Sequence, residues 1–206
     1  MLILLVGILS STVWVFELGS SIYVLYNCED KGMNKRLRKH AVLLNLVTQM
    51  QEIGLPTTTR YIYAVLYILE PVVDHGYKIS WYKNNAYSPD AEDGLTELFS
   101  AGVVKYVCTN VSLPLQVFVC KPDKVRGTLG DDPHRDIVQS VLLKLKDLPY
   151  SVVECVPLML KQIRDGKNKL SAMYEFGKYK SVLAVPNAMA DQVHDVALDI
   201  EQAIKR

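Results

Sequence analysis

Apolar residues recur at helical spacing in two early segments of the chain, residues 43–53 and 62–69. Gly54 and Pro56 lie between the two segments and mark the end of the first one, because glycine and proline both disfavour the helix interior. Residues 77–83 follow with the alternation of apolar and polar residues that is typical of a short strand. The pattern therefore predicts two helices and then a strand.

A third helix and a β-hairpin are predicted next. Ser88 followed by Pro89 is typical of a helix start, because the hydroxyl caps free N–H groups and proline has no N–H to leave unpaired. Gly102 is placed to end this helix in a Schellman motif. The segments VVKYVCT and LQVFVCK then alternate as the two strands of a hairpin do. The order helix, helix, strand, helix, hairpin is that of a winged helix.

The last third of the chain carries further apolar stripes at helical spacing. We therefore predict a mainly α fold with a small β component (α+β), in which the winged-helix-like order is followed by a C-terminal helical part. The expected parts are an apolar N-terminal segment, residues 1–32, a winged-helix-like domain, residues 33–126, and the C-terminal helical part, residues 127–206, packing on that domain.

Residues 1–26 are apolar apart from Glu17 and a few small polar residues. A segment of this length could cross a hydrocarbon layer of ~30 Å, and the basic residues after it would leave the rest of the chain in the cytoplasm. It lacks the basic start of a secretory signal. We rank three interpretations: translation that begins at Met33, a membrane anchor, and a pair of core strands. The expected localisation is cytoplasmic, with a membrane-anchored protein as the alternative.

Composition and motifs point away from an enzyme. Lys and Arg number 23 against 22 Asp and Glu, so no strong overall charge attracts nucleic acid or membrane. The four cysteines are interpreted mainly as small buried hydrophobic residues, although Cys108 and Cys120 could pair across a hairpin. No metal-ligand spacing and no phosphate-binding glycine loop is present in the sequence. We predict no catalytic residue, metal or cofactor, with an undetected convergent active site as an alternative.

The helix predicted after Ser88 is acidic. In a winged-helix DNA reader the equivalent helix enters the major groove, where phosphates would repel carboxylates. Aromatic residues before this helix are of the types that anchor protein interfaces. We therefore expect a protein partner at this surface. The expected partner-binding residues are Trp81, Tyr82, Tyr87, Asp90, Glu92, Asp93 and Glu97.

A basic arm forms the first one or two turns of the first long helix and provides the alternative binding surface. It consists of Lys35, Arg36, Arg38 and Lys39. Positive charges at a helix start oppose the helix dipole, so a negatively charged partner would stabilise them. Nucleic acid, an acidic protein or anionic lipid headgroups could fill that role. The alternative function is a winged-helix-type, DNA-binding transcriptional regulator that uses this arm.

The segments RYIYAVLYILEP and GYKISWYKNNAYSPDAEDGLTELFSAGVV resemble the core of the Panacea domain, the phage-associated or SocA-like antitoxin family, and the related YwgA-like proteins. The resemblance covers roughly residues 43–107. It departs from the family at Asn85-Ala86, where those proteins usually have Gly-Pro. It implies a non-enzymatic, antitoxin-like or adaptor-like domain that binds a protein such as a toxin. The matching residues are Tyr77, Trp81, Tyr82, Tyr87, Ser88, Pro89, Leu95, Leu98, Gly102 and Val103.

Overall fold

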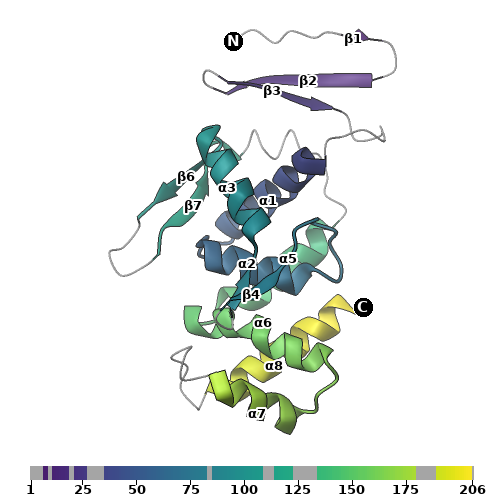
Figure 1. Cartoon of the computed structure of the whole chain (residues 1–206), viewed down its shortest axis with the longest axis vertical. Coiled ribbons are helices and arrows are strands. Elements are labelled where there is room, and N and C mark those ends of the chain that lie inside the picture. Colours follow the sequence, from purple (N-terminus) through teal and green to yellow (C-terminus); the bar gives the residue numbers. More distant parts are fainter. Residues whose placement is uncertain are drawn as a thin grey trace.

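The computed structural model has the mainly helical fold, with small antiparallel sheets, that the sequence predicts. It describes residues 7–8, 11–18, 21–26, 35–82, 85–108, 114–122, 134–179 and 189–205. Figure 1 shows the arrangement of these elements. The helices are α1 (Lys35–Glu52), α2 (Thr59–Leu69), α3 (Pro89–Ser100), α5 (Arg135–Lys146), α6 (Tyr150–Arg164), α7 (Lys169–Tyr179) and α8 (Met189–Ile204). After α1, the strands are β4 (Ser80–Tyr82), β5 (Asn85–Tyr87), β6 (Val104–Val107) and β7 (Gln116–Val119).

The winged-helix-like order is confirmed, with one addition. The strand expected over residues 77–83 is shorter, because only β4 pairs, and it pairs with β5, which the sequence pattern did not indicate. Trp81 lies opposite Ala86 in this two-stranded antiparallel sheet. The backbone N–H of Tyr77 instead donates to a ring nitrogen of His75 at 3.1 Å, so the start of the expected strand is used in a turn.

The caps of α3 form as the sequence predicts. The Ser88 hydroxyl accepts a hydrogen bond from the backbone N–H of Ala91 at 3.2 Å, and Pro89 occupies the first helical turn. At the other end Gly102 has a φ of 69°, a left-handed conformation that glycine adopts without strain. Gly102 and Val103 donate to the carbonyls of Phe99 and Leu98, which completes a Schellman motif.

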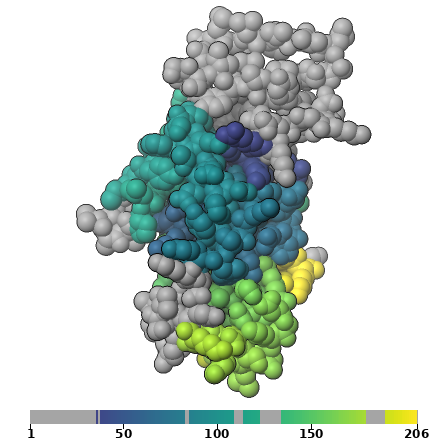
Figure 2. Space-filling model, viewed as in Figure 1, coloured from purple at the N-terminus to yellow at the C-terminus, as the bar shows by residue number. Residues whose placement is uncertain are grey.

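One continuous hydrophobic core joins the segments before residue 108 to the C-terminal helices. Leu43 on α1, Leu66 on α2, Val153 on α6 and Ile200 on α8 are all buried in it. Helix α6 lies between α2 and the pair formed by α7 and α8 (Figure 1). In the space-filling view the green C-terminal helices follow directly on the blue segments (Figure 2). The expected boundary at residues 127–133 lies outside the described residues.

The described parts of the first 26 residues are strands. They are β1 (Gly7–Ile8), β2 (Ser11–Leu18) and β3 (Ser21–Tyr26), and β2 pairs antiparallel with both neighbours. The secondary structure therefore agrees with the strands expected in the third interpretation of this segment, a pair of core strands. Among the helices that the structure describes, none combines the length and apolar character needed to span a membrane. The proposed start at Met33 lies outside the described residues.

The cysteines correct one expectation. Cys155 is buried, as predicted, but Cys108 and Cys120 are exposed, and all three are free. The register of β6 and β7 pairs Val104 with Val119, so Cys120 follows β7 at one end of the hairpin while Cys108 follows β6 at the other. A disulfide between these two cysteines is therefore excluded, because they do not face each other across the hairpin. Cys28 lies outside the described residues.

Candidate binding site

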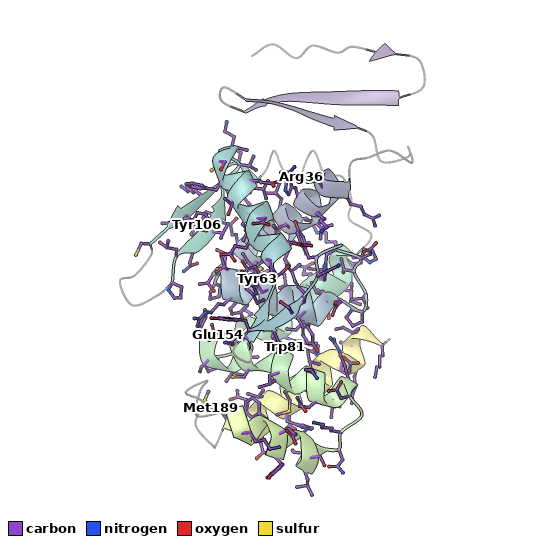
Figure 3. All side chains as sticks on the ribbon, viewed as in Figure 1. Arg36, Tyr63, Trp81, Tyr106, Glu154 and Met189 are labelled. Atoms are coloured by element: carbon purple, nitrogen blue, oxygen red, sulfur yellow. The ribbon has the colours of Figure 1, made fainter. Side chains whose placement is uncertain are left out.

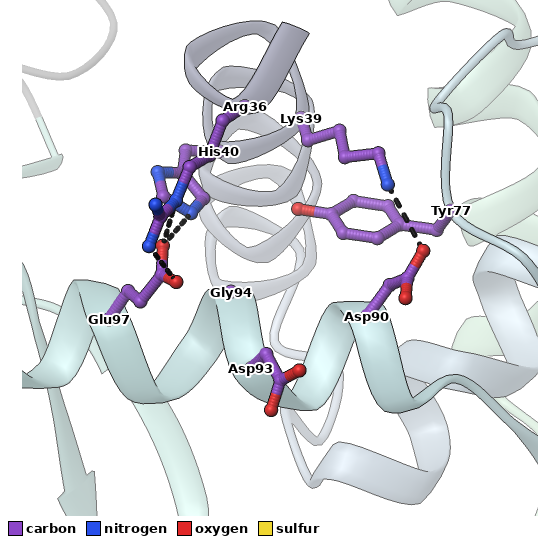
Figure 4. A pocket seen from close by; sticks show the side chains of 8 residues that line it. All are labelled: Arg36, Lys39, His40, Tyr77, Asp90, Asp93, Gly94 and Glu97. Carbon is purple, nitrogen blue, oxygen red and sulfur yellow. Dashed lines mark hydrogen bonds and ion pairs between the residues drawn. The ribbon is translucent and has the colours of Figure 1, made fainter.

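The basic arm and the acidic helix, which the sequence presented as two separate surfaces, pair with each other. Arg36 donates from Nε to Glu97 at 2.8 Å and forms a second contact with the same carboxylate. Lys39 Nζ lies 3.1 Å from an oxygen of Asp90. Figure 4 shows these pairs crossing from α1 to α3. They form because Asp90 and Glu97 are seven residues apart, about two helical turns, and so share the face of α3 that packs on α1.

His40 joins the ion pair at Glu97. Its Nε2 lies 2.9 Å from a carboxylate oxygen of Glu97, next to the Arg36 guanidinium. Burial lowers the pKa of His40, and the negative charge of Glu97 opposes part of that shift. The hydrogen bond from Arg36 lowers the pKa of Glu97, so this carboxylate stays ionised. The α1 side of α3 is therefore a mixed-charge contact within the chain.

A groove between α1 and α3 is lined by these residues. Its volume is about 380 Å³. Tyr77 lies within it, and the Lys39 ammonium stands 5.1 Å from the centroid of the tyrosine ring. A Cβ at position 94 would lie 3.2 Å from the Tyr77 hydroxyl oxygen, so glycine at this position leaves room for the phenol. We call this the α1–α3 groove. Its lining residues are Arg36, Lys39, His40, Tyr77, Asp90, Asp93, Gly94 and Glu97.

Aromatic residues of α3 and of the neighbouring strands lie beside this helix, and one of them, Tyr87, contacts the Glu92 carboxylate. The Tyr87 hydroxyl donates to Glu92 at 2.6 Å, and the Tyr82 ring lies 6.1 Å from that of Tyr87. The Phe99 and Tyr106 rings are 5.3 Å apart. Burial, and after it the charge of Glu92, raises the pKa of Tyr106. We call these five residues, Tyr82, Tyr87, Glu92, Phe99 and Tyr106, the aromatic–acidic surface.

The predicted aromatic residues divide between this surface and the core. Tyr82 is 60% exposed, whereas Trp81 is half-buried and meets the Tyr67 ring edge-on at 5.0 Å. Neighbouring residues of a strand point to opposite faces, so β4 turns one aromatic inward and one outward. Tyr87 packs on Tyr63, which is buried on α2. Figure 3 marks Tyr63 on α2, Trp81 on β4 and Tyr106 on β6.

The remaining predicted charges are distributed around the same helices. Arg38 lies 3.8 Å from Asp74, and Lys35 is the first residue of α1. Glu92 and Asp93 are exposed on α3, and Asp93 is the carboxylate of the groove for which no ion pair exists among the described residues. The structure therefore brings the basic arm into contact with Asp90 and Glu97, while Glu92 lies with the aromatic residues.

Sequence reasoning did not select Tyr77, Gly94, His40, Phe99 or Tyr106 as site residues. One signal was available: His40 follows Arg36 by four residues, which places both side chains on one face of a helix. Phe99 follows Glu92 by seven residues in the same way. No such spacing connects Tyr106 or Tyr77 to α3, because the turn before β4 and the hairpin bring them there.

Among the described residues, no group of histidines, cysteines and carboxylates is placed to hold a metal ion. Comparison with models of known protein families finds none that matches this chain, and comparison with curated proteins finds no match either. The fold and the two surfaces of α3 thus define a mainly helical protein with a winged-helix-like order of elements, a mixed-charge groove and an aromatic–acidic surface.

Proposed function

We propose that this protein is a non-enzymatic, antitoxin-like or adaptor-like module that binds a protein partner through the aromatic–acidic surface. The observation that carries the proposal is the exposure of aromatic rings on α3 and on the strand before it: Tyr82 is 60% exposed and Phe99 is 50% exposed. Aromatic side chains concentrate binding energy in protein interfaces, because they bury a large area at a low cost in conformational entropy.

The chemistry of this surface favours a partner that is both basic and apolar. Asp90 and Glu97 are already paired with α1 and Asp93 lines the α1–α3 groove, so Glu92 is the carboxylate of the outer side of α3 that remains for an outside partner. A partner segment that carries Lys or Arg beside an apolar side chain would meet the charge and the rings together. The acidic helix therefore acts through its outer side in this proposal.

The resemblance of residues 43–107 to the Panacea domain suggests the kind of partner. In that family the domain neutralises a toxin protein or serves as an adaptor. The matching residues Tyr82 and Tyr87 belong to the aromatic–acidic surface, while Tyr77 belongs to the α1–α3 groove. A toxin-like protein is accordingly the partner to look for first.

The test compares two matched pairs of substitutions. The full chain is purified from its native cells, the proteins that come with it are identified, and binding of each purified candidate is measured by calorimetry. Tyr82→Ser with Phe99→Ser should weaken binding about 100-fold, since interface aromatics commonly contribute more than ~2 kcal/mol together. The control is Leu170→Ser with Tyr174→Ser, which removes exposed apolar residues from α7. Equal weakening by both pairs, or none by either, would contradict the proposal.

DNA binding through the basic arm is the competing function. Arg36 and Lys39 are held by carboxylates of α3, so phosphates would have to displace Glu97 and Asp90. Such an exchange replaces one anion with another at each cation, so it gains less binding free energy than the pairing of phosphates with unpaired cations would. The measurement is the mobility of duplex DNA with the full chain at low salt. Retarded DNA, released as salt rises, would favour this function over the protein-binding one.

A further inference from the structure

Tyr77 presents a buried polar group that lacks a partner. The residue is 4% exposed, its hydroxyl oxygen exposes less than 1 Å² and it forms no hydrogen bond with any described residue. Burial raises the pKa of Tyr77, and the charges of Glu97 and Asp90 raise it further, so the phenol keeps its proton. Figure 4 shows the ring reaching between α1 and α3 with its hydroxyl toward the middle of the groove. Buried hydroxyls are normally paired, because leaving one unpaired costs free energy.

The charges of the groove do not cancel. Three carboxylates line it, from Asp90, Asp93 and Glu97, against the two permanent cations of Arg36 and Lys39. Each cation is paired with one carboxylate, and burial lowers the pKa of the nearby histidine, which favours its neutral form. The Asp93 carboxylate is therefore left over, as is the Tyr77 oxygen, and both can accept hydrogen bonds.

We propose that the α1–α3 groove binds an organic cation that carries N–H groups, a primary ammonium or a guanidinium. The Asp93 carboxylate supplies the opposite charge, and the Tyr77 oxygen accepts a hydrogen bond from the bound group. An anion would find Arg36 and Lys39 already occupied. The volume of about 380 Å³ lies within the usual range for small-molecule sites. This inference does not depend on the protein partner proposed above, because the groove lies on the other side of α3.

Access to the Tyr77 oxygen requires one side chain to turn aside. Lys39 lies over the phenol ring and is held by an ion pair to Asp90, while His40 lies beside Gly94 and contacts Glu97. The Lys39 ammonium can move away from Asp90 and admit the bound cation beside Asp93, because a single partly exposed ion pair contributes little to the stability of the fold. Binding is accordingly expected to shift the NMR signals of Lys39 and His40 together with those of Asp93.

The experiment titrates the full-length protein with four chloride or sodium salts and follows binding by NMR and calorimetry. Butylammonium and ethylguanidinium carry N–H donors, tetramethylammonium carries the charge without them, and butyrate carries the opposite charge. The N–H cations should bind about ten-fold more tightly than tetramethylammonium, and butyrate should not bind. Equal binding of tetramethylammonium, or binding of butyrate alone, would overturn the assignment.

Two variants test the named residues. Asp93→Asn and Tyr77→Phe should each weaken butylammonium binding about five-fold or more, while the matched control Asp147→Asn, an exposed carboxylate next to α5, should leave it unchanged. Asp93 is exposed, so its replacement does not threaten folding. If Asp93→Asn binds as tightly as the unaltered protein, the proposal fails.

The source of the cation is decided by a further pair of probes, the methylamides of Nα-acetyl-lysine and Nα-acetyl-arginine, which keep the charged side chain and have no charged backbone groups. Binding at least as tight as that of butylammonium or ethylguanidinium assigns the groove to a basic side chain of another protein. Binding of the small amines alone assigns it to a free metabolite. Both results uphold the cation site. Absence of binding by every N–H cation would overturn it.

Discussion

Gly94 shows how one residue can set the shape of a site. A Cβ at this position would lie 3.2 Å from the Tyr77 hydroxyl oxygen and 3.5 Å from Cδ2 of His40. Alanine is otherwise the better helix residue by ~1 kcal/mol, but overpacking a buried contact costs ~1–3 kcal/mol. We therefore expect Gly94→Ala to lower the free energy of unfolding by about 1 kcal/mol, as measured by urea denaturation.

The same substitution in a Tyr77→Phe background is the control. Removing the hydroxyl oxygen removes the nearest atom, so Gly94→Ala should there be neutral or stabilising. An identical effect of Gly94→Ala in both backgrounds would show that the phenol is not the residue that requires glycine.

His75 makes stability depend on pH. Its Nε2 faces the carbonyl of Leu66 at 3.1 Å and its Nδ1 accepts from the N–H of Tyr77, so the ring is held in its neutral form. Burial lowers the pKa of His75 below 6.5, and the backbone hydrogen bond and the charges of Glu70 and Asp74 oppose this while Lys39 adds to it. As pH falls below 6.5, the unfolded chain therefore takes up a proton before the folded one, and stability decreases.

The expected outcome is a free energy of unfolding that is constant just above pH 7 and begins to fall as the pH drops through about 6.5, the ordinary pKa of histidine, above the range in which carboxylates titrate. His40 shifts in the same direction and contributes to the loss. A His75→Gln variant should be less stable at pH 7 and show a flatter pH profile in urea unfolding. A profile as steep as that of the unaltered protein would exclude His75 as the cause.

At the scale of the element, the contact between α1 and α3 can be measured as a pair energy. Arg36 and Glu97 are partly exposed, and solvent weakens such pairs, so their coupling is small in double-mutant cycles. We expect a small favourable coupling between Arg36→Gln and Glu97→Gln at low salt, and a smaller one in 1 M salt because counterions screen the pair. A parallel cycle between Lys161 and Asp165, which pair within one exposed turn, is the control for local helix effects.

Local features of the elements could be predicted from sequence because the residues that make them are neighbours. Ser88, Pro89 and Gly102 define the ends of α3 within a few residues of each other, and all three act as expected. Strand β5 was missed because it is only three residues long and begins with Asn85 and Ala86, two residue types that are uncommon in strands, so that only its pairing with β4 defines it. Helical spacing, in contrast, identified the described helices.

The pairing of the basic arm with the acidic helix could not be predicted. Arg36 and Glu97 are 61 residues apart, and only the packing of α1 on α3 brings them together. The sequence shows which charges exist but not which of them face the same groove. The basic arm and the acidic helix were therefore each interpreted as a surface that binds another molecule. The partial burial of Trp81 could not be predicted for a related reason: alternation predicts that one of two neighbouring aromatics is buried, without saying which.

At the scale of the whole molecule, Arg164 connects three helices. Its guanidinium donates to the carbonyls of Tyr67 and Ile68 at 3.2 and 3.0 Å, at the end of α2, and to Glu201 on α8 at 2.9 Å. It also stands 5.2 Å from the centroid of the Tyr67 ring. Both charged side chains are largely buried, so each compensates the other's loss of hydration.

Replacing this arginine alone should therefore be costly. We expect Arg164→Met to lower the free energy of unfolding by ~3 kcal/mol, because Glu201 would be left as a buried, less well paired charge and two carbonyls would lose a donor. The double variant Arg164→Met with Glu201→Leu should recover part of the loss in the same urea titration. A double variant less stable than the single one would contradict this explanation.

The Arg164 contact also has a consequence for the order in which the native structure opens. A helix end whose carbonyls accept hydrogen bonds from a side chain of another helix cannot fray unless those hydrogen bonds break. The last turn of α2 should therefore exchange its amide protons with deuterium only when α6 and α8 separate, at a free energy close to that of the largest cooperative unit. The N-terminal turn of α1, held by exposed ion pairs, should exchange long before it.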